Sequence, residues 1–213
     1  MSATNPSPTV SDSRTPAEWW RTLCEVVMPK RKGARIVVSG DLHHEPHQAL
    51  KQLREWQAYG ITHILDVRGE HSDIDFVAKH APEITYIECG THDDGGPQDA
   101  AWFDSALEKV GTALFEESAV VLVHCHMGVN RASSISVRLL LAQGYDLFPI
   151  LDAIRKARPI AAILYAEDAV DHWLANESVE VRRDARRTVR AWHDDNPVDI
   201  GWIISRIRRV EHN

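Results

Sequence analysis

Short apolar runs alternate with amphipathic stretches along most of the chain. The apolar runs predict β-strands over residues 35–39, 61–67, 84–89 and 119–123. Apolar positions at helical spacing predict helices over 46–59, 73–79, Phe103 to Leu114, 131–143, Asp146 to Arg158, and 164–176. Strands separated by helices predict an α/β fold, with a mainly parallel central sheet and helices on both of its faces.

The N-terminal end differs from the rest of the chain in composition. Residues 1–14 are rich in Ser, Thr and Pro, which predicts disorder. Thr15 and Glu18 have the spacing of a capping box, and Pro16 stands at the first helical position. These residues predict a helix that begins here and continues to Val27.

The C-terminal end is rich in arginine. The arginines that form a basic stripe on one predicted helix are Arg182, Arg183, Arg186, Arg187 and Arg190. We expect a solvated helix that packs on the main domain through apolar residues such as Trp192. Docking of acidic partners or phosphate-bearing surfaces is the alternative. The predicted divisions of the chain are a tail plus helix over 1–34, a main domain over 35–177 and an Arg-rich extension over 178–213.

Composition sets limits on the class of protein. The chain has 213 residues, of which 44% are hydrophobic and 26% charged, as expected for one globular domain with extensions. A formal net charge of −7 argues against a dedicated nucleic-acid binder. The apolar runs are too short to span a bilayer, and the N-terminus lacks a secretory pattern. Three cysteines, an odd number, argue against a disulfide framework, so we expect a cytoplasmic protein.

The stretch from Val121 to Ser133 has the pattern of a buried strand, a tight loop and the start of a helix. Cys125 opens the loop, Gly128 lies in its middle, and Arg131 follows six positions after the cysteine. Successive N–H groups and a helix N-terminus around one concavity form an anion site. This field is expected to lower the pKa of Cys125 and make it nucleophilic. Arg131 offers a planar fork for two phosphoryl oxygens, so the pattern predicts transfer of a phosphoryl group to the sulfur.

The sequence His124-Cys125-x5-Arg131 resembles the signature loop of the cysteine-based protein tyrosine phosphatase superfamily. The variant His-Cys-x-Met-Gly-Val-x-Arg is similar to the dual-specificity branch, and the resemblance covers residues 35–174. It implies a phosphatase domain over 35–177 that uses neither a metal nor another cofactor. It also implies that His124 supports the loop through hydrogen bonds. The residues expected to bind phosphate, mainly through their N–H groups, are His126, Met127, Gly128, Val129 and Asn130, together with the Arg131 side chain.

Departure of the leaving oxygen needs a proton donor. Asp93 is the first choice because it lies in a polar, glycine-rich loop that follows a predicted strand. In the dual-specificity pattern a tyrosine precedes the general acid by seven positions, and Tyr86 has this spacing to Asp93. The adjacent Asp94 is the alternative. The same carboxylate is then expected to act as a base that activates water against the phospho-cysteine.

Two positions depart from the family pattern. The family usually has Ser or Thr directly after the arginine, where the hydroxyl helps the thiolate leave during hydrolysis. This chain has Ala132 there, with Ser133 and Ser134 beyond it, which predicts slow hydrolysis and accumulation of the phospho-enzyme. The stretch 154–163 resembles the helix after the catalytic core but lacks the family's usual Asn, so the core must be supported differently there.

Other histidines and cysteines of the sequence are candidate metal ligands or redox residues. His43, His44 and His47 have no cysteine at compact ligand spacing, so we expect exposed histidines at a helix start and no metal. Cys89 is expected to be a buried strand cysteine. A disulfide between Cys89 and Cys125 under oxidation is the alternative.

The sequence therefore predicts a phosphomonoester hydrolase of the dual-specificity type that forms a cysteinyl-phosphate. Its expected substrate is a phosphorylated protein carrying phosphotyrosine, with or without phosphoserine and phosphothreonine. One alternative is a phosphatase of small-molecule or RNA 5′ phosphates, since His-Cys-x-x-Gly-x-Asn-Arg is also similar to RNA 5′-triphosphatases of this superfamily. Another is a pseudo-phosphatase that binds phosphorylated partners without turnover. The oligomeric state is left open.

Overall fold

The computed structural model describes residues 14–211, so the disorder expected for residues 1–13 falls outside the described part. The strands are β1 (Cys24–Glu25), β2 (Arg35–Ser39), β3 (His63–Arg68), β4 (Thr85–Thr91) and β5 (Val120–His124). The helices before β5 are α1 (Pro16–Trp20), α2 (Pro46–Tyr59), α3 (Ile74–His80), α4 (Ala100–Val110) and the 3-10 helix η1 (Gly111–Phe115). Those after it are α5 (Arg131–Ala142), α6 (Leu147–Ala157), α7 (Ala166–Trp173), α8 (Val179–Asp195) and α9 (Ile200–Glu211).

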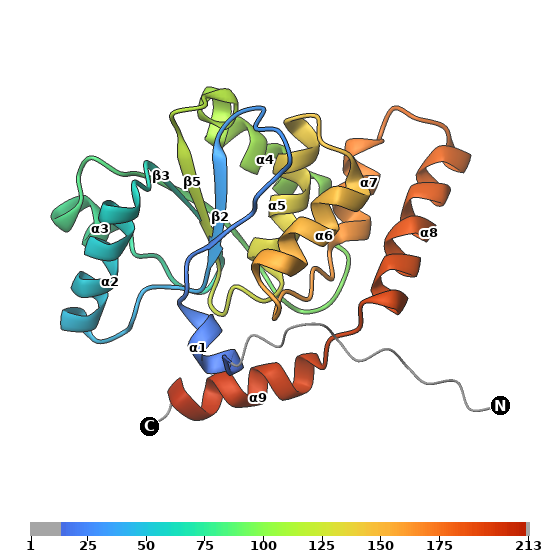
Figure 1. Cartoon of the computed structure of the whole chain (residues 1–213). Coiled ribbons are helices and arrows are strands. Elements are labelled where there is room, and N and C mark those ends of the chain that lie inside the picture. Colours follow the sequence, from blue (N-terminus) through green and yellow to red (C-terminus); the bar gives the residue numbers. More distant parts are fainter. Residues whose placement is uncertain (1–13, 212–213) are drawn as a thin grey trace.

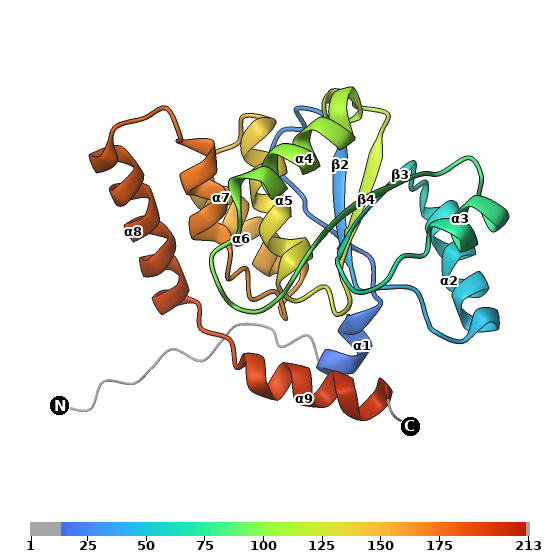
Figure 2. The same cartoon turned by 180° about the vertical axis from the view of Figure 1, so that it is seen from behind.

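The strands form one sheet in the order β1-β2-β5-β3-β4. β1 is antiparallel to β2, and the pairs β2–β5, β5–β3 and β3–β4 are parallel. α2 and α3 cover one face, and α4, α5, α6 and α7 lie on the other side (Figures 1 and 2). The predicted α/β fold with a mainly parallel sheet and helices on both faces is confirmed.

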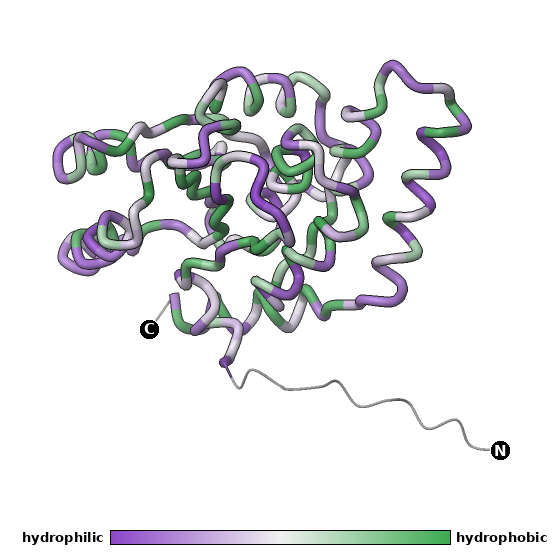
Figure 3. Tube along the Cα trace, turned by 45° about the horizontal axis from the view of Figure 1, so that its top comes forward, coloured by the Kyte–Doolittle hydropathy of each residue, from purple (hydrophilic) through white to green (hydrophobic). Residues whose placement is uncertain are grey.

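The apolar strand β5 supplies both layers of the core. Val121 and Val123 point into the layer beneath the helices α4 to α7, while Val120 and Leu122 point into the layer beneath α2 and α3. Successive side chains of a strand face opposite sides of a sheet, so a continuous apolar run is what a doubly covered central strand requires. Hydrophobic positions accordingly gather on the strands and on the inward faces of the helices (Figure 3).

The first helix is shorter than the sequence predicts. Its capping box is formed, but α1 ends at Trp20, so the predicted continuation to Val27 is wrong. Cys24 and Glu25 are instead extended and pair with the outer edge of β2. The edge of a sheet presents unpaired N–H and C=O groups, and pairing them outweighs the local preference for more helix.

The Arg-rich extension forms two helices instead of one, and α8 packs beside α7 (Figure 1). Arg182 and Arg186 form ion pairs with Asp171, and Arg190 pairs with Glu167 at 2.7 Å. Much of the basic stripe is therefore neutralised by carboxylates of the same chain, which favours the packed helix over the docking alternative. None of the helices within residues 14–211 has the length and apolar character needed to cross a membrane.

The carboxyl ends of the parallel strands meet at one edge of the sheet, and α1 and α9 lie along this edge (Figures 1 and 2). Ile203 and Ile207 of α9 are buried against Trp19 and Trp20 of α1. Loops at the carboxyl ends of parallel strands build the binding sites of α/β proteins. The loop after β5, which the sequence singles out, belongs to this edge and lies under these two terminal helices.

Candidate functional site

The loop between β5 and α5 has its carbonyl groups bound from outside. The Trp20 indole donates to the carbonyl oxygen of His126 at 2.8 Å. The guanidinium of Arg158 donates to those of Met127 and Gly128 at 2.9 and 2.7 Å. The N–H of Ala162 donates to that of Val129 at 2.7 Å. Since the C=O and the following N–H of a trans peptide point in opposite directions, the N–H groups of residues 127–130 face the inside of the loop.

Gly128 permits the tight curvature of this loop. Its φ is +63°, in the left-handed region that favours glycine. A Cβ atom here would lie 2.4 Å from the carbonyl oxygen of Ser39 and 2.6 Å from a guanidinium nitrogen of Arg158. The sequence therefore places glycine where both the conformation and the close approach of β2 exclude a side chain.

Arg131, the first residue of α5, is buried and held by carboxylates. Its Nη1 and Nη2 each donate to an oxygen of Glu70 at 2.6 Å, and Nη1 also donates to the carbonyl oxygen of Thr91 at 2.9 Å. Its Nε is a buried donor without a hydrogen-bond partner, 3.5 Å from an oxygen of Asp93. Burial opposes the charge of Arg131, but the hydrogen bonds to Glu70 outweigh it and raise the pKa. Hydrogen bonding to Arg131 in turn lowers the pKa of Glu70 to about 2.

Cys125 is 2% exposed and lies among opposing electrostatic influences. Burial raises the pKa of its thiol, and Asp93 adds to this rise. Arg131 and the N–H groups of Ala132 and Gly128 act in the opposite direction. The predicted depression of the Cys125 pKa is therefore not found in this arrangement, because burial outweighs a guanidinium that is already paired with carboxylates.

The two candidate acids differ in their contacts. Asp93 Oδ1 accepts hydrogen bonds from the Asn130 side chain and from the Tyr165 hydroxyl, both at 2.7 Å. Asp94 instead accepts from the N–H of Gly96 at 2.9 Å, inside its own turn. Burial and the hydrogen bond to Asp93 raise the pKa of Tyr165 to about 12, so its hydroxyl remains a donor. These contacts tie Asp93, and not Asp94, to the loop that carries Cys125.

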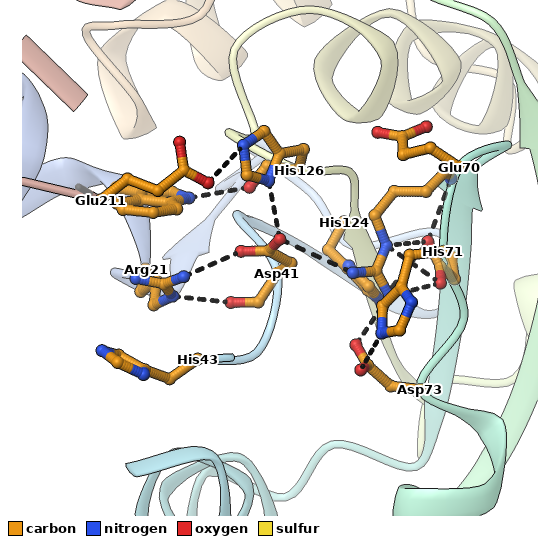
Figure 4. Close-up of polar contacts among 12 residues, drawn as sticks. Arg21, Asp41, His43, Glu70, His71, Asp73, His124, His126 and Glu211 are labelled. Atoms are coloured by element: carbon orange, nitrogen blue, oxygen red, sulfur yellow. Dashed lines mark hydrogen bonds and ion pairs between the residues drawn. The ribbon is translucent and has the colours of Figure 1, made fainter. Parts of the chain in front are cut away.

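His126 joins the loop to two other segments (Figure 4). Its Nδ1 lies 2.8 Å from Asp41 Oδ2, and its Nε2 lies 3.1 Å from an oxygen of Glu211 at the end of α9. The hydrogen bond with Asp41 raises the pKa of His126, and the nearby Glu211 and Glu70 contribute. These carboxylates thus favour the protonated imidazole and balance its charge.

His124 does not support the loop in the expected way. Neither ring nitrogen has a hydrogen-bond partner within the described structure, and Nε2 is 3.8 Å from Asp66. The ring is buried between Trp56 and Tyr86, with ring centroids 5.8 and 6.4 Å away. Burial lowers the pKa of His124, which favours the neutral ring. Its support for the adjacent Cys125 comes from packing.

One cavity of about 430 Å³ collects these groups. Its lining residues from the predicted site are Cys125, Arg131, Asp93, Asp94, His126, Met127, Val129 and Asn130. Glu70, Gly95, Leu164 and three residues of α9 complete the lining. Gly128 contributes through its backbone, whereas His124 lies behind the loop. The arrangement can hold a phosphoryl group against a sulfur nucleophile, with a carboxylic acid at the side.

Sequence reasoning did not identify several residues that shape the site. Glu70 follows β3 and so lies at the same sheet edge as the loop after β5, which was the available signal. Arg158 belongs to the stretch after the catalytic core that resembles the family. For Tyr165 and Glu211 the sequence contained no signal, because their partners are 72 and 85 positions away.

The other candidate ligands form no metal site among residues 14–211. No group of three or more His, Cys, Asp or Glu there has the geometry to hold a metal ion. Cys24, Cys89 and Cys125 are all free and buried. Ser133 donates to the carbonyl oxygen of Gly128, and the Ser134 hydroxyl contacts Asn130, so both hydroxyls next to Ala132 are engaged away from the sulfur.

Comparison with known proteins agrees with this geometry. The sequence model of the dual specificity phosphatase catalytic domain matches residues 43–163. Dual specificity protein phosphatase 26 of Rattus norvegicus is 27% identical over 111 residues, which are 52% of each chain. The Homo sapiens protein of the same name is 26% identical, again over 52% of each chain. The chain thus spans about half the length of the curated relatives that it matches.

Solved structures share the fold at low sequence identity. DUSP15 aligns with a TM-score of 0.51 and 16% identity over 74% of this chain and 94% of its own. The human tyrosine phosphatase-like serine/threonine/tyrosine-interacting protein aligns with a TM-score of 0.52 and 13% identity over 73% of this chain and 98% of its own. Both matches cover nearly all of those chains and support a common fold.

Replacement of Glu70 tests the charge balance around Cys125. In Glu70→Gln the guanidinium of Arg131 loses one of its two neighbouring carboxylate charges, so the Cys125 pKa should fall by about 0.5–1 unit. The measurement is the pH dependence of Cys125 alkylation by iodoacetamide, with the modified residue identified by mass spectrometry. Glu83→Gln, on the exposed surface beside Gln57, is the control. An unchanged or raised midpoint in Glu70→Gln would contradict the role given to Glu70.

Proposed function

The chain belongs to the dual-specificity phosphatase family, because the family's catalytic-domain model covers 121 of its 213 residues, and from this premise we propose that it is a cysteine-based phosphatase of phosphorylated proteins. Its substrate is a phosphomonoester, either phosphotyrosine alone or phosphotyrosine together with phosphoserine and phosphothreonine. The reaction proceeds through a cysteinyl-phosphate. The catalytic domain corresponds to residues 35–177, with the flanking segments as additions to it.

One observation carries the proposal more than any other. The buried Nε of Arg131 is a donor without a hydrogen-bond acceptor in the described part of the chain, and it lies in the cavity that contains Cys125, towards which the loop N–H groups also point. Buried donors normally have partners. A group with several acceptor oxygens and negative charge satisfies such donors together, and a phosphoryl group has this chemistry.

In the first step, because burial raises the pKa of Cys125, its thiol gives up its proton to water, and the resulting thiolate attacks phosphorus. The S–P bond forms while the bond between phosphorus and the ester oxygen breaks, and the loop N–H groups with Arg131 hold the three remaining oxygens. Asp93 donates its proton to the departing oxygen, so the product leaves as a neutral alcohol or phenol. Tyr165 and Asn130, which both donate to Asp93 Oδ1, hold this carboxyl group against the loop.

In the second step water releases the phosphate. The Asp93 carboxylate takes a proton from water, whose oxygen attacks phosphorus as the S–P bond breaks. The bonding electrons return to the sulfur of Cys125, and inorganic phosphate leaves. Ala132 offers no hydroxyl to the departing sulfur, so this step is the slower one.

We also propose a cytoplasmic location, since three free cysteines with a reactive one among them suit a reducing compartment.

Loss of phosphate release in Cys125→Ser tests the function. The wild-type protein should release phosphate from p-nitrophenyl phosphate and from a phosphotyrosine peptide. Cys125→Ser should be slower by at least about 10³-fold, since the covalent route is lost. Cys89→Ser, at another buried cysteine, is the matched control.

The same assay separates the alternative functions. A wild-type protein that binds the phosphopeptide without releasing phosphate is a phosphate-binding pseudo-phosphatase. Preferential hydrolysis of nucleotides, inositol phosphates or RNA 5′-triphosphate ends would replace the protein substrate with one of those phosphates. Either result contradicts the proposal.

The general acid is tested by a pair of neighbouring variants. Asp93→Asn should lower kcat/KM, which reports the first step, by about 10²-fold on an alkyl phosphate, whose leaving oxygen needs the proton, and by less on p-nitrophenyl phosphate. Asp94→Asn should lower kcat/KM by less than about threefold, because its carboxylate is held in its own turn. Steady-state kinetics on both substrates give the ratio. A larger loss in Asp94→Asn would reverse the assignment.

A serine at position 132 tests the rate of the second step. In Ala132→Ser the new hydroxyl can donate to the departing sulfur, so kcat should rise up to about tenfold and the initial burst of product should shrink. Rapid-mixing measurements of the burst, with trapping of the phospho-enzyme, report both changes. Ala142→Ser, at the far end of α5, is the control. An unchanged kcat without a burst in either protein would show that another step limits turnover.

A further inference from the structure

The helix α9 lies outside the part of the chain that matches the family, which ends at residue 163, and yet it forms one wall of the cavity that contains Cys125. Ile200, Ile204 and Arg208 line this cavity. They follow one another at intervals of four residues, so they share one face of the helix. A C-terminal addition thus contributes a row of side chains to the site.

The position of α9 is fixed by contacts on its other side. Ile203 and Ile207 are buried in the cluster that includes Trp19 and Trp20 of α1. At the end of the helix, Glu211 contacts the ring of His126, a residue of the loop itself. The helix α9 is therefore held in place by one apolar and one charged contact, and its position does not depend on Arg208.

The wall has an apolar part and a charged end. Ile200 and Ile204 lie opposite the loop, and Leu164, which is 46% exposed, completes an apolar lining together with Met127. Such a lining suits an aromatic ring that enters behind its phosphate. One turn further along α9 stands Arg208, which is exposed and forms no ion pair or hydrogen bond within residues 14–211.

Within residues 14–211 no carboxylate pairs with Arg208, in contrast to the arginines of α8 that pair with Asp171 and Glu167. Two further residues of the lining are already engaged: Arg131 by Glu70, and the His126 ring by Asp41 and Glu211. A cation at the rim, one helical turn beyond an apolar slot, is placed to contact an anionic side chain of the peptide next to the phosphorylated residue.

We propose that α9 is the substrate-recognition wall of this phosphatase, in which Ile200 and Ile204 contact the ring of phosphotyrosine and Arg208 binds an acidic group of the flanking peptide. The inference rests on the proposed function and deepens it, because it names the substrate as a phosphotyrosine peptide with an acidic neighbour. The anionic group is a carboxylate or a second phosphate, which share the chemistry that Arg208 recognises.

The test compares kcat/KM for peptides that differ only beside one phosphotyrosine. The neighbours are alanine, glutamate, phosphothreonine or lysine, placed within two positions on both sides. The wild-type protein should prefer the glutamate peptide to the alanine peptide by about fivefold, the upper range for an exposed ion pair, and this ratio should fall with added salt. A larger ratio for phosphothreonine than for glutamate identifies a second phosphate as the preferred group.

Variants of Arg208 should remove or reverse this preference. In Arg208→Ala the ratio of the glutamate to the alanine peptide should fall to about one, and in Arg208→Glu the lysine peptide should become the better substrate. The matched control is Arg206→Ala, on the same helix but stacked over Trp202 at 5.6 Å and outside the cavity lining. It should keep the wild-type ratio. Ile204→Ala should lower the ratio of phosphotyrosine to phosphoserine hydrolysis.

The outcomes separate this inference from the proposed function. If the wild-type protein hydrolyses all the peptides with equal kcat/KM, or if Arg208→Ala leaves the ratio unchanged, the inference fails and the phosphatase activity stands. If no peptide is hydrolysed, calorimetric binding of the same peptides to Cys125→Ser decides. Tighter binding of the glutamate peptide that is lost on adding Arg208→Ala supports the inference, and equal or absent binding overturns it.

Discussion

Arg158 is fully buried, and its charge is met by backbone dipoles instead of a carboxylate. Its guanidinium donates to the carbonyl oxygens of Trp19, Trp20, Thr22, Met127 and Gly128. A buried cation is costly unless such acceptors surround it. Because these carbonyls turn towards Arg158, the N–H groups that follow them in the loop turn away from it and into the cavity. The anion-binding capacity of the loop thus depends on a positive charge placed behind it.

The front of the loop contains a second balance of charges. In the proposed reaction Arg131 attracts the phosphoryl group, whereas Glu70 and Asp93 compete for the same guanidinium. In a buried site these interactions are only weakly screened, so the protonation of Cys125 depends on how Arg131 is shared. Glu70, whose side chain is 49% exposed, is the partner that can move away from Arg131 when an anion binds there. The sulfur and the phosphate site are therefore coupled through one arginine.

The sequence predicts the structure best where apolar spacing, glycines and reactive residues occur together within a short segment. The helix that Gly60 terminates and the strand, loop and helix around Cys125 agree with their predicted positions, because local spacing determines them. Contacts between residues that are far apart in the sequence cannot be predicted from local spacing. Cys24–Glu25, for example, is extended only because β2 has an open edge. Glu70 and Arg131 are 61 positions apart and meet only in the fold. The direction of the Cys125 pKa shift likewise depends on burial, which periodicity does not quantify.

The terminal helices meet the loop at His126. Trp20 of α1 binds its carbonyl oxygen, and Glu211 of α9 and Asp41 bind its ring. Because these partners raise the His126 pKa above the ordinary 6.5, the contact with α9 is at full strength below that pH and is lost as pH rises through the folded-state value. The family fold supplies a reacting centre, and its substrate range is set by what surrounds that centre. In this chain the surroundings include α1 and α9, which lie outside the part that matches the family model, and both contact the loop at His126.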